Sequence, residues 1–145
     1  MFIAKNNDLI ILVKETREEL KQALQFMVYT SIEETDVEYQ LYNGEYLTPE
    51  EIEQKERERL NSLTLTKADF WIALLDRGIT KEMVKEKVNL ISDEKLKAKT
   101  LIRIDDADHF WRGDSSMDIV GAMFGLTTVD LDWLFENGEL PEADV

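Results

Sequence analysis

The 145-residue chain has no cysteine and a single histidine. Without cysteine it can form no disulfide bond, no thiolate metal site and no cysteine nucleophile. Basic residues are also scarce, because 17 lysines and arginines stand against 31 acidic residues and leave a formal net charge of -14. Affinity for nucleic acids comes largely from Lys and Arg side chains that neutralise phosphates. We therefore expect no direct binding of DNA or RNA.

Long hydrophobic runs are missing as well. The apolar stretch near the start of the chain, residues 9–13, covers only five residues and follows no small-residue cleavage pattern, so we expect neither a signal peptide nor a membrane span. What the sequence does contain is 43% hydrophobic and 9% aromatic residues, enough for the core of one ordinary domain or two small ones. We expect an intracellular protein that makes no membrane contact.

Residues 1–47 are expected to form a small unit of the order ββαββ. Two runs of β-forming residues, 2–4 and 9–13, are separated by a polar stretch of Lys, Asn and Asp that suits a tight turn. A capping box from Thr16 to Glu19 then begins a helix over about residues 17–27.

The end of this unit is expected to be a hairpin. Residues 37–41 alternate in character, and Asn43-Gly44 stands just before a second short strand over residues 45–47. Asn-Gly between two such runs is the strongest short signal for a hairpin turn. The tyrosines of this region are interpreted as packing and rim residues of a small sheet, with a partner-binding aromatic face as the alternative.

Residues 48–63 are expected to form a charged helix that links two halves of the chain. Thr48 can cap its N-terminus, a proline follows, and acidic residues occupy the first turn. Its body alternates acidic and basic side chains and carries only three apolar ones, Ile52, Leu60 and Leu63. We interpret it as a solvated connector, and a helix for self-association or for a partner is the alternative.

Residues 64–145 are expected to form an acidic bundle of about five helices, which makes the whole chain α+β. Two joints in it share one pattern, Gly78-Ile79-Thr80 and Gly125-Leu126-Thr127. In each, the glycine can end a helix in the left-handed conformation, and the threonine can cap the next helix. Each joint predicts an αα-hairpin. DNA recognition by the second would need basic side chains, and no Lys or Arg follows Arg112.

One cluster, made of Asp105, Asp106, Asp108 and His109, offers three carboxylates and the only histidine. A calcium loop needs acids at alternate positions and a glycine at the sixth, which is absent here. If a helix continues through the cluster, Asp105, His109 and Arg112 share one face, and His109 or Arg112 pairs internally with the acids. The chain also shows no glycine-rich phosphate loop and no Ser/His/Asp order. We expect no metal, no cofactor and no catalytic residue, and a metal-dependent enzyme at this cluster is an alternative.

The best-specified segment, residues 110–135, indicates where a partner could bind. Its apolar side chains have the spacing of a helical core, and acidic side chains lie between them. Whether this segment binds a partner depends on the exposure of its two tryptophans, because an exposed tryptophan beside carboxylates would be an aromatic anchor for a partner. The candidate partner-binding residues are Trp111, Asp114, Asp118, Asp130, Asp132, Trp133 and Glu136.

The C-terminal half also carries an order of packing and capping residues that is similar to a known group. These residues are Leu65-Thr66-Lys67, Phe70, Leu74-Leu75, Gly78-Ile79-Thr80, Phe110, Arg112, the run from Ile119 to Phe124, Gly125-Leu126-Thr127 and the run from Leu131 to Phe135. In this order the chain resembles a loosely defined group of small proteins encoded in the tail-gene region of bacteriophages and prophages. The resemblance implies a mobile element and a role in tail assembly, on the virion or in contact with the host.

We therefore predict a non-enzymatic phage-derived protein that acts by protein–protein contact in the tail or its assembly. Its expected location is the cytoplasm of a bacterial host, with association with the virion as the alternative. The alternative function is an acidic inhibitor of a host nucleic-acid-binding enzyme, of the anti-CRISPR or nucleic-acid-mimic kind. The net charge of -14 motivates it, since carboxylates can compete for a surface that holds phosphates. The partner is a tail component or a basic host protein, and the oligomeric state stays open.

Overall fold

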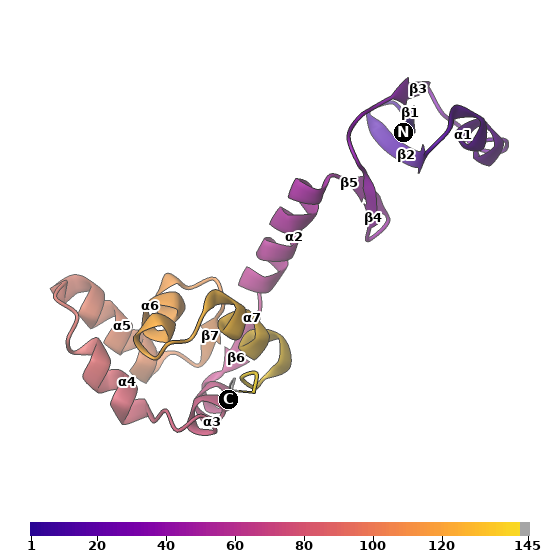
Figure 1. The fold of residues 1–145 in the computed structure, drawn as a ribbon. Coiled ribbons are helices and arrows are strands. Elements are labelled where there is room, and N and C mark those ends of the chain that lie inside the picture. Colours follow the sequence, from indigo (N-terminus) through magenta and orange to yellow (C-terminus); the bar gives the residue numbers. More distant parts are fainter. Residues whose placement is uncertain (143–145) are drawn as a thin grey trace. The chain divides into compact units, whose positions relative to one another are not determined.

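The structure, a computed structural model, describes residues 1–142 (Figure 1). Within these residues the chain forms seven helices and three small antiparallel sheets, so the expected α+β class is confirmed. The chain divides into two compact units, unit 1 over Met1–Glu56 and unit 2 over Arg57–Val145. Each has its own hydrophobic cluster, and each is described separately below.

Unit 1 is built on a three-stranded sheet with the strand order β2-β1-β3. Strand β1 (Phe2–Asn6) pairs antiparallel with β2 (Leu9–Lys14) on one side and with β3 (Ser31–Glu34) on the other. Helix α1 (Arg17–Ala23) begins at its cap Thr16, whose side chain accepts from the Glu19 amide at 3.1 Å. The helix then packs against the sheet.

The order in unit 1 is ββαβββ, so the prediction of ββαββ missed strand β3. Helix α1 is also shorter than the predicted 17–27, because it ends at Ala23. Leu24 is the last buried residue of this segment, and Met27 is exposed. The chain instead returns to β1, where the Thr30 amide donates to the Lys5 carbonyl oxygen at 2.6 Å. This tertiary connection overrides the helical spacing of Met27.

The predicted hairpin is present, but its first strand covers Gln40–Tyr42 and not residues 37–41. Strands β4 (Gln40–Tyr42) and β5 (Glu45–Leu47) pair across Asn43 and Gly44, which have φ angles of 48° and 84°. Two left-handed residues in succession are what this tight turn requires, and Asn-Gly supplies them at low cost. Helix α2 (Pro49–Asn61) follows, and Thr48 caps it by accepting from the Glu51 amide at 3.2 Å. The boundary between the two units falls inside α2.

In residues 64–142, unit 2 contains five helices, as expected, and a two-stranded ribbon that the sequence did not predict (Figure 1). Its elements are β6 (Thr64–Thr66), α3 (Lys67–Leu75), α4 (Lys81–Val88), α5 (Glu94–Asp106), β7 (His109–Trp111), α6 (Ser115–Met123) and α7 (Thr128–Asn137). Helix α4 contacts both α5 and α6, and α6 contacts α7. Strands β6 and β7 pair antiparallel and place Leu65 opposite Phe110. Because α5 ends at Asp106 and a strand follows, no helix continues from Asp105 to Arg112.

The glycine ends and threonine caps predicted at the two joints are confirmed. Gly78 and Gly125 have φ angles of 77° and 72°, in the left-handed region where glycine avoids the steric cost of a Cβ. After each, the next amide bonds back to the helix: Ile79 N donates to the Leu74 carbonyl at 3.0 Å, and Leu126 N to the Gly121 carbonyl at 2.8 Å. This is the Schellman pattern. Thr80 and Thr127 then cap α4 and α7, as predicted.

The core of unit 2 is organised around an aromatic cluster. Phe70 on α3 and Phe110 on β7 have ring centroids 4.5 Å apart, and Phe135 on α7 lies 6.3 Å from Phe70. All three are buried, together with aliphatic side chains from all five helices of this unit. Burial of side chains of this size stabilises by about 1.5–3 kcal/mol each, so this cluster is the main support for α3, β7 and α7. It also sets which faces of β7 and α7 point outward.

Candidate functional site

The two tryptophans whose exposure the sequence left open, Trp111 and Trp133, both lie largely at the surface. Trp111 is 63% exposed and Trp133 is 48% exposed. Trp111 follows the buried Phe110 on β7, and side chains on a strand alternate between its two faces. Trp133 stands on α7 beside the buried Leu134, on the helix face that turns away from the core. The condition for an aromatic anchor in this segment is therefore met.

Two of the predicted surface acids cap helices. Asp114 is the N-cap of α6, where its side chain accepts from the Ser116 amide at 3.0 Å, and it also forms an ion pair with Arg103. Asp130 forms a reciprocal capping box with Thr127 at the start of α7, at 2.9 Å and 3.1 Å. Both carboxylates satisfy helix amides that have no partner within the helix. Asp114 and Asp130 therefore stabilise the N-termini of α6 and α7.

Asp132 is the centre of an ion-pair network. It accepts from both terminal nitrogens of Arg57 at 2.9 Å and 2.7 Å, and from Nε of Arg112 at 2.8 Å. Arg112 is only 3% exposed, and its other contact is the Asp118 carboxylate at 3.1 Å. The paired fork of Arg57 fixes the carboxylate in one orientation. The network joins the C-terminal part of α2 to α6, α7 and the residue that follows β7, and all of its residues belong to unit 2.

The ion pairs of this network shift the pKa values of Asp132 and Arg57 in favour of their charged forms. Burial alone would raise the pKa of the Asp132 carboxyl, but hydrogen bonds from Arg57 and Arg112 outweigh burial and hold that pKa below its ordinary value. The hydrogen bond to Asp132 likewise raises the pKa of Arg57, against a smaller opposing effect of desolvation. Asp132 is therefore ionised at neutral pH, and its charge is neutralised by the two guanidinium groups.

Beside this network lies a shallow groove of about 350 Å³, here named the α7 groove. It is lined by Arg59, Leu60, Val129, Asp132, Trp133, Glu136 and Asn137. Val129 and Trp133 lie one turn apart on α7 and are both exposed. Glu136 pairs with Arg59 at 3.0 Å at the rim. The groove thus combines apolar side chains with a rim of paired charges.

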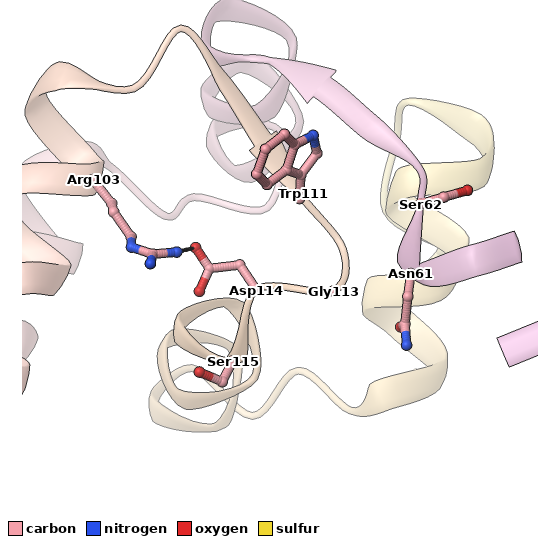
Figure 2. A pocket seen from close by; sticks show the side chains of 7 residues that line it. All are labelled: Asn61, Ser62, Arg103, Trp111, Gly113, Asp114 and Ser115. Atoms are coloured by element: carbon pink, nitrogen blue, oxygen red, sulfur yellow. Dashed lines mark hydrogen bonds and ion pairs between the residues drawn. The ribbon is translucent and has the colours of Figure 1, made fainter. Parts of the chain in front are cut away.

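A second, more polar hollow of about 700 Å³ lies beside Trp111 (Figure 2). Figure 2 shows Arg103 and Asp114 pointing toward one another, with the Trp111 ring standing at the edge of the hollow. The other lining residues are Asn61, Ser62, Gly113 and Ser115. Gly113 lets the chain pass close to α2, since a Cβ there would lie 2.8 Å from the Asn61 carbonyl oxygen.

The lining of this hollow offers hydroxyl groups but no base that could activate them. It contains neither histidine nor lysine. Its carboxylate, Asp114, is already engaged by Arg103 and by the Ser116 amide. A serine nucleophile needs a base within hydrogen-bond reach. The lining thus consists of hydroxyl and amide groups, one ion pair and the Trp111 ring.

The acidic cluster at 105–109 lies across the end of α5 and the start of β7. Asp105 pairs with Lys85 at 2.5 Å and Lys81 at 3.7 Å, and the hydrogen bond from Lys85 lowers the pKa of its carboxyl. Within residues 1–142, no group of three His, Asp or Glu side chains is placed to hold a metal ion. The expected pairing with Arg112 does not occur, because Arg112 faces Asp118 and Asp132 instead.

The sequence did not indicate that α2 contributes to the site. Arg57, Arg59 and Leu60 come from a stretch of alternating charge that resembles a solvated helix. Their partners on α7 lie 75 and 77 positions further along the chain. The only local signal was Leu60 itself, an apolar residue late in a charged helix.

Comparison of the chain with protein-family models, curated proteins and solved structures finds no match. In the part of the chain that the structure describes, no helix has the length and apolar character needed to cross a membrane.

Proposed function

We propose that this protein is a non-enzymatic binding protein that holds another protein in its α7 groove, with Trp133 as the anchor. The single observation that carries the proposal is the exposure of Trp133 next to Val129 and Leu60 in a groove whose rim charges are already paired. Tryptophan is the residue most enriched among those that dominate binding energy at protein interfaces. An apolar helix or loop of the partner would cover it.

The groove is suited to binding because its charged side chains already have partners within unit 2. The Arg57–Asp132 and Arg59–Glu136 pairs hold the end of α2 against α7, and the Asp130 capping box fixes the start of α7. A surface that is ordered in advance loses little conformational entropy on binding. Removal of one such aromatic anchor typically costs 2 kcal/mol or more, which is about a 30-fold loss of affinity.

The setting that we propose is the tail of a bacteriophage or its assembly in the bacterial cytoplasm. This part of the proposal rests on the resemblance of the packing and capping residues to small proteins of phage tail-gene regions. Tail assembly proceeds through contacts between proteins and asks for no catalytic centre in each component. The partner is accordingly a tail component. If that component is incorporated into the virion, this protein becomes associated with the virion as well.

The alternative, an acidic inhibitor that imitates nucleic acid, is less well supported by this surface. A phosphate mimic needs carboxylates that are free to meet a basic groove. Here Asp114, Asp118, Asp132 and Glu136 each pair with an arginine. The basic groups of such an enzyme would have to displace these arginines from the carboxylates. Breaking the existing ion pairs would offset much of the electrostatic attraction that the net charge provides.

The test is affinity purification of the full chain from cells that express its native gene neighbourhood, compared with binding to a purified basic nuclease. Trp133→Ala combined with Val129→Ser should remove a discrete tail-protein partner, whereas Leu90→Ser, at a residue that is 79% exposed outside the groove, should not. Strong, salt-weakened binding of a nuclease that survives the groove substitutions would overturn the proposal and favour the inhibitor.

A further inference from the structure

The loop between α1 and β3 displays an apolar surface that has no place in the core. Four consecutive large side chains, Phe26, Met27, Val28 and Tyr29, are 92%, 44%, 78% and 44% exposed. Single exposed apolar residues are common on proteins, but a contiguous group marks a contact with another molecule. We name these four residues the apolar loop. It belongs to unit 1, so it is separate from the α7 groove of unit 2.

The backbone holds the apolar loop in this position. At its start, the Met27 amide donates to the Leu24 carbonyl at 2.9 Å. At its end, the Thr30 amide donates to the Lys5 carbonyl, and the Thr30 hydroxyl accepts from the Asn7 amide at 2.8 Å. The side chains between these anchor points therefore face solvent as a consequence of the fold.

The apolar loop is followed in the sequence by an edge strand of the sheet. Strand β3 begins at Ser31, immediately after the loop, and stands at the end of the sheet order β2-β1-β3. Within residues 1–142, no further strand pairs with β3 on its outer side. Unpaired strand edges accept an extended segment of another chain through main-chain hydrogen bonds, and neighbouring side chains then determine which segment fits.

Charge indicates what kind of segment fits. Unit 1 carries thirteen acidic against five basic residues, a net charge of -8. Strand β3 itself ends in Glu33 and Glu34, and both side chains are exposed, although Glu33 already pairs with Lys5 at 3.0 Å. A second copy of this chain would bring the same net charge of -8 to the contact, and charges of one sign repel each other. A segment with Lys or Arg would instead form favourable pairs.

We infer that unit 1 binds an extended, basic segment of another protein, which adds to β3 as a strand and covers Phe26 and Val28 with apolar side chains. In the bound segment, basic and apolar side chains should alternate, because successive residues of a strand face opposite sides of the sheet. The contact gives this protein a second docking surface, and its partner is defined by chemistry that differs from that of the α7 groove.

The test selects peptides from a random display library on the full chain and then measures the winners as soluble peptides by fluorescence anisotropy. The inference expects cationic peptides with alternating apolar residues. Their affinity should fall at least tenfold on Phe26→Ser with Val28→Ser, and also on Glu34→Lys. It should stay unchanged on the matched control Leu90→Ser and on Trp133→Ala, which reports the proposed function separately.

Three results would overturn the inference. The first is that no selected peptide depends on Phe26 and Val28. The second is that the dependent peptides are acidic or bind as helices. The third is that the chain dimerises in sedimentation experiments through Phe26 and Val28, which would make a second copy the occupant. Unchanged melting temperatures of the variants establish that they fold, and Glu34→Lys tests the charge argument without touching the apolar side chains.

Discussion

Replacement of Asp132 by alanine should destabilise unit 2 far more than the loss of any other single acidic side chain of the α7 groove. The carboxylate accepts three hydrogen bonds from Arg57 and Arg112. Its removal leaves Arg112, which is 3% exposed, with only Asp118 as its counter-ion. Loss of one partner of a fully buried ion pair costs about 3–5 kcal/mol.

The expected cost at this site is smaller. The side chains of Asp132 and Arg57 are 20% and 37% exposed, so water replaces part of what Arg57 loses. We expect a loss of about 2–3 kcal/mol in the free energy of unfolding. For a unit of this size that corresponds to a fall in melting temperature of roughly 10 °C or more.

The assay is urea unfolding followed by tryptophan fluorescence. All three tryptophans, Trp71, Trp111 and Trp133, lie in unit 2, so the signal reports this unit alone. The matched control is Glu136→Ala, because the Glu136–Arg59 pair is about 40% exposed on both sides and should contribute only about 0–1 kcal/mol. Equal losses for the two variants would refute the view that Asp132 is the centre of the network.

The pH dependence gives a second check on the same carboxylate. Its folded pKa is lowered, so the unfolded chain binds the proton more readily, and the stability that Asp132 contributes is complete above the unfolded pKa of about 4. That contribution disappears as the pH falls through the folded pKa. The difference in stability between the natural chain and Asp132→Asn should therefore be constant from pH 5 to 7 and shrink below about pH 4. A difference that grows on acidification would contradict the assignment.

Further predictions concern the joint between α6 and α7. Gly121→Ala should destabilise unit 2 by about 1–3 kcal/mol in the same urea assay, because its Cβ would lie 2.9 Å from Cδ1 of Leu131. Gly125→Ala should cost about 1–2 kcal/mol from the left-handed backbone alone, since nothing lies within 4 Å of the new Cβ; a neutral result would contradict the Schellman cap. Thr127→Ala should cost about 1 kcal/mol through loss of the capping box with Asp130, measured against Thr128→Ala as the neighbouring control.

Local signals predicted the joints of the fold well. The glycine ends and threonine caps of α3–α4 and α6–α7 act within a few residues, so the side chains that specify them are adjacent in the sequence. The same holds for the Asn43-Gly44 turn. Strands β3, β6 and β7 were missed because three or four residues are too few to show a period of two. The pairing of β6 with β7 also joins residues that are far apart in the chain.

The candidate site was predictable only in part. The sequence singled out Trp111 and Trp133, but whether a tryptophan packs inside or faces solvent depends on the strand or helix face that the core selects. The acids around them were expected to form an open acidic surface. The structure pairs most of them with arginines, and Arg57 and Arg59 come from a helix that precedes α7 by more than 60 residues. Such long-range ion pairs leave no pattern in the local sequence.

Photo-crosslinking from the α7 groove in living cells tests most directly whether this groove holds a partner protein. A photoreactive amino acid at position 129 replaces a side chain that is 73% exposed, and the same group at position 90 serves as the control. We predict one discrete adduct with a tail protein from position 129, none from position 90, and loss of the adduct on Trp133→Ala. The same adducts from both positions, or an adduct with a nuclease that persists without Trp133, would contradict the account.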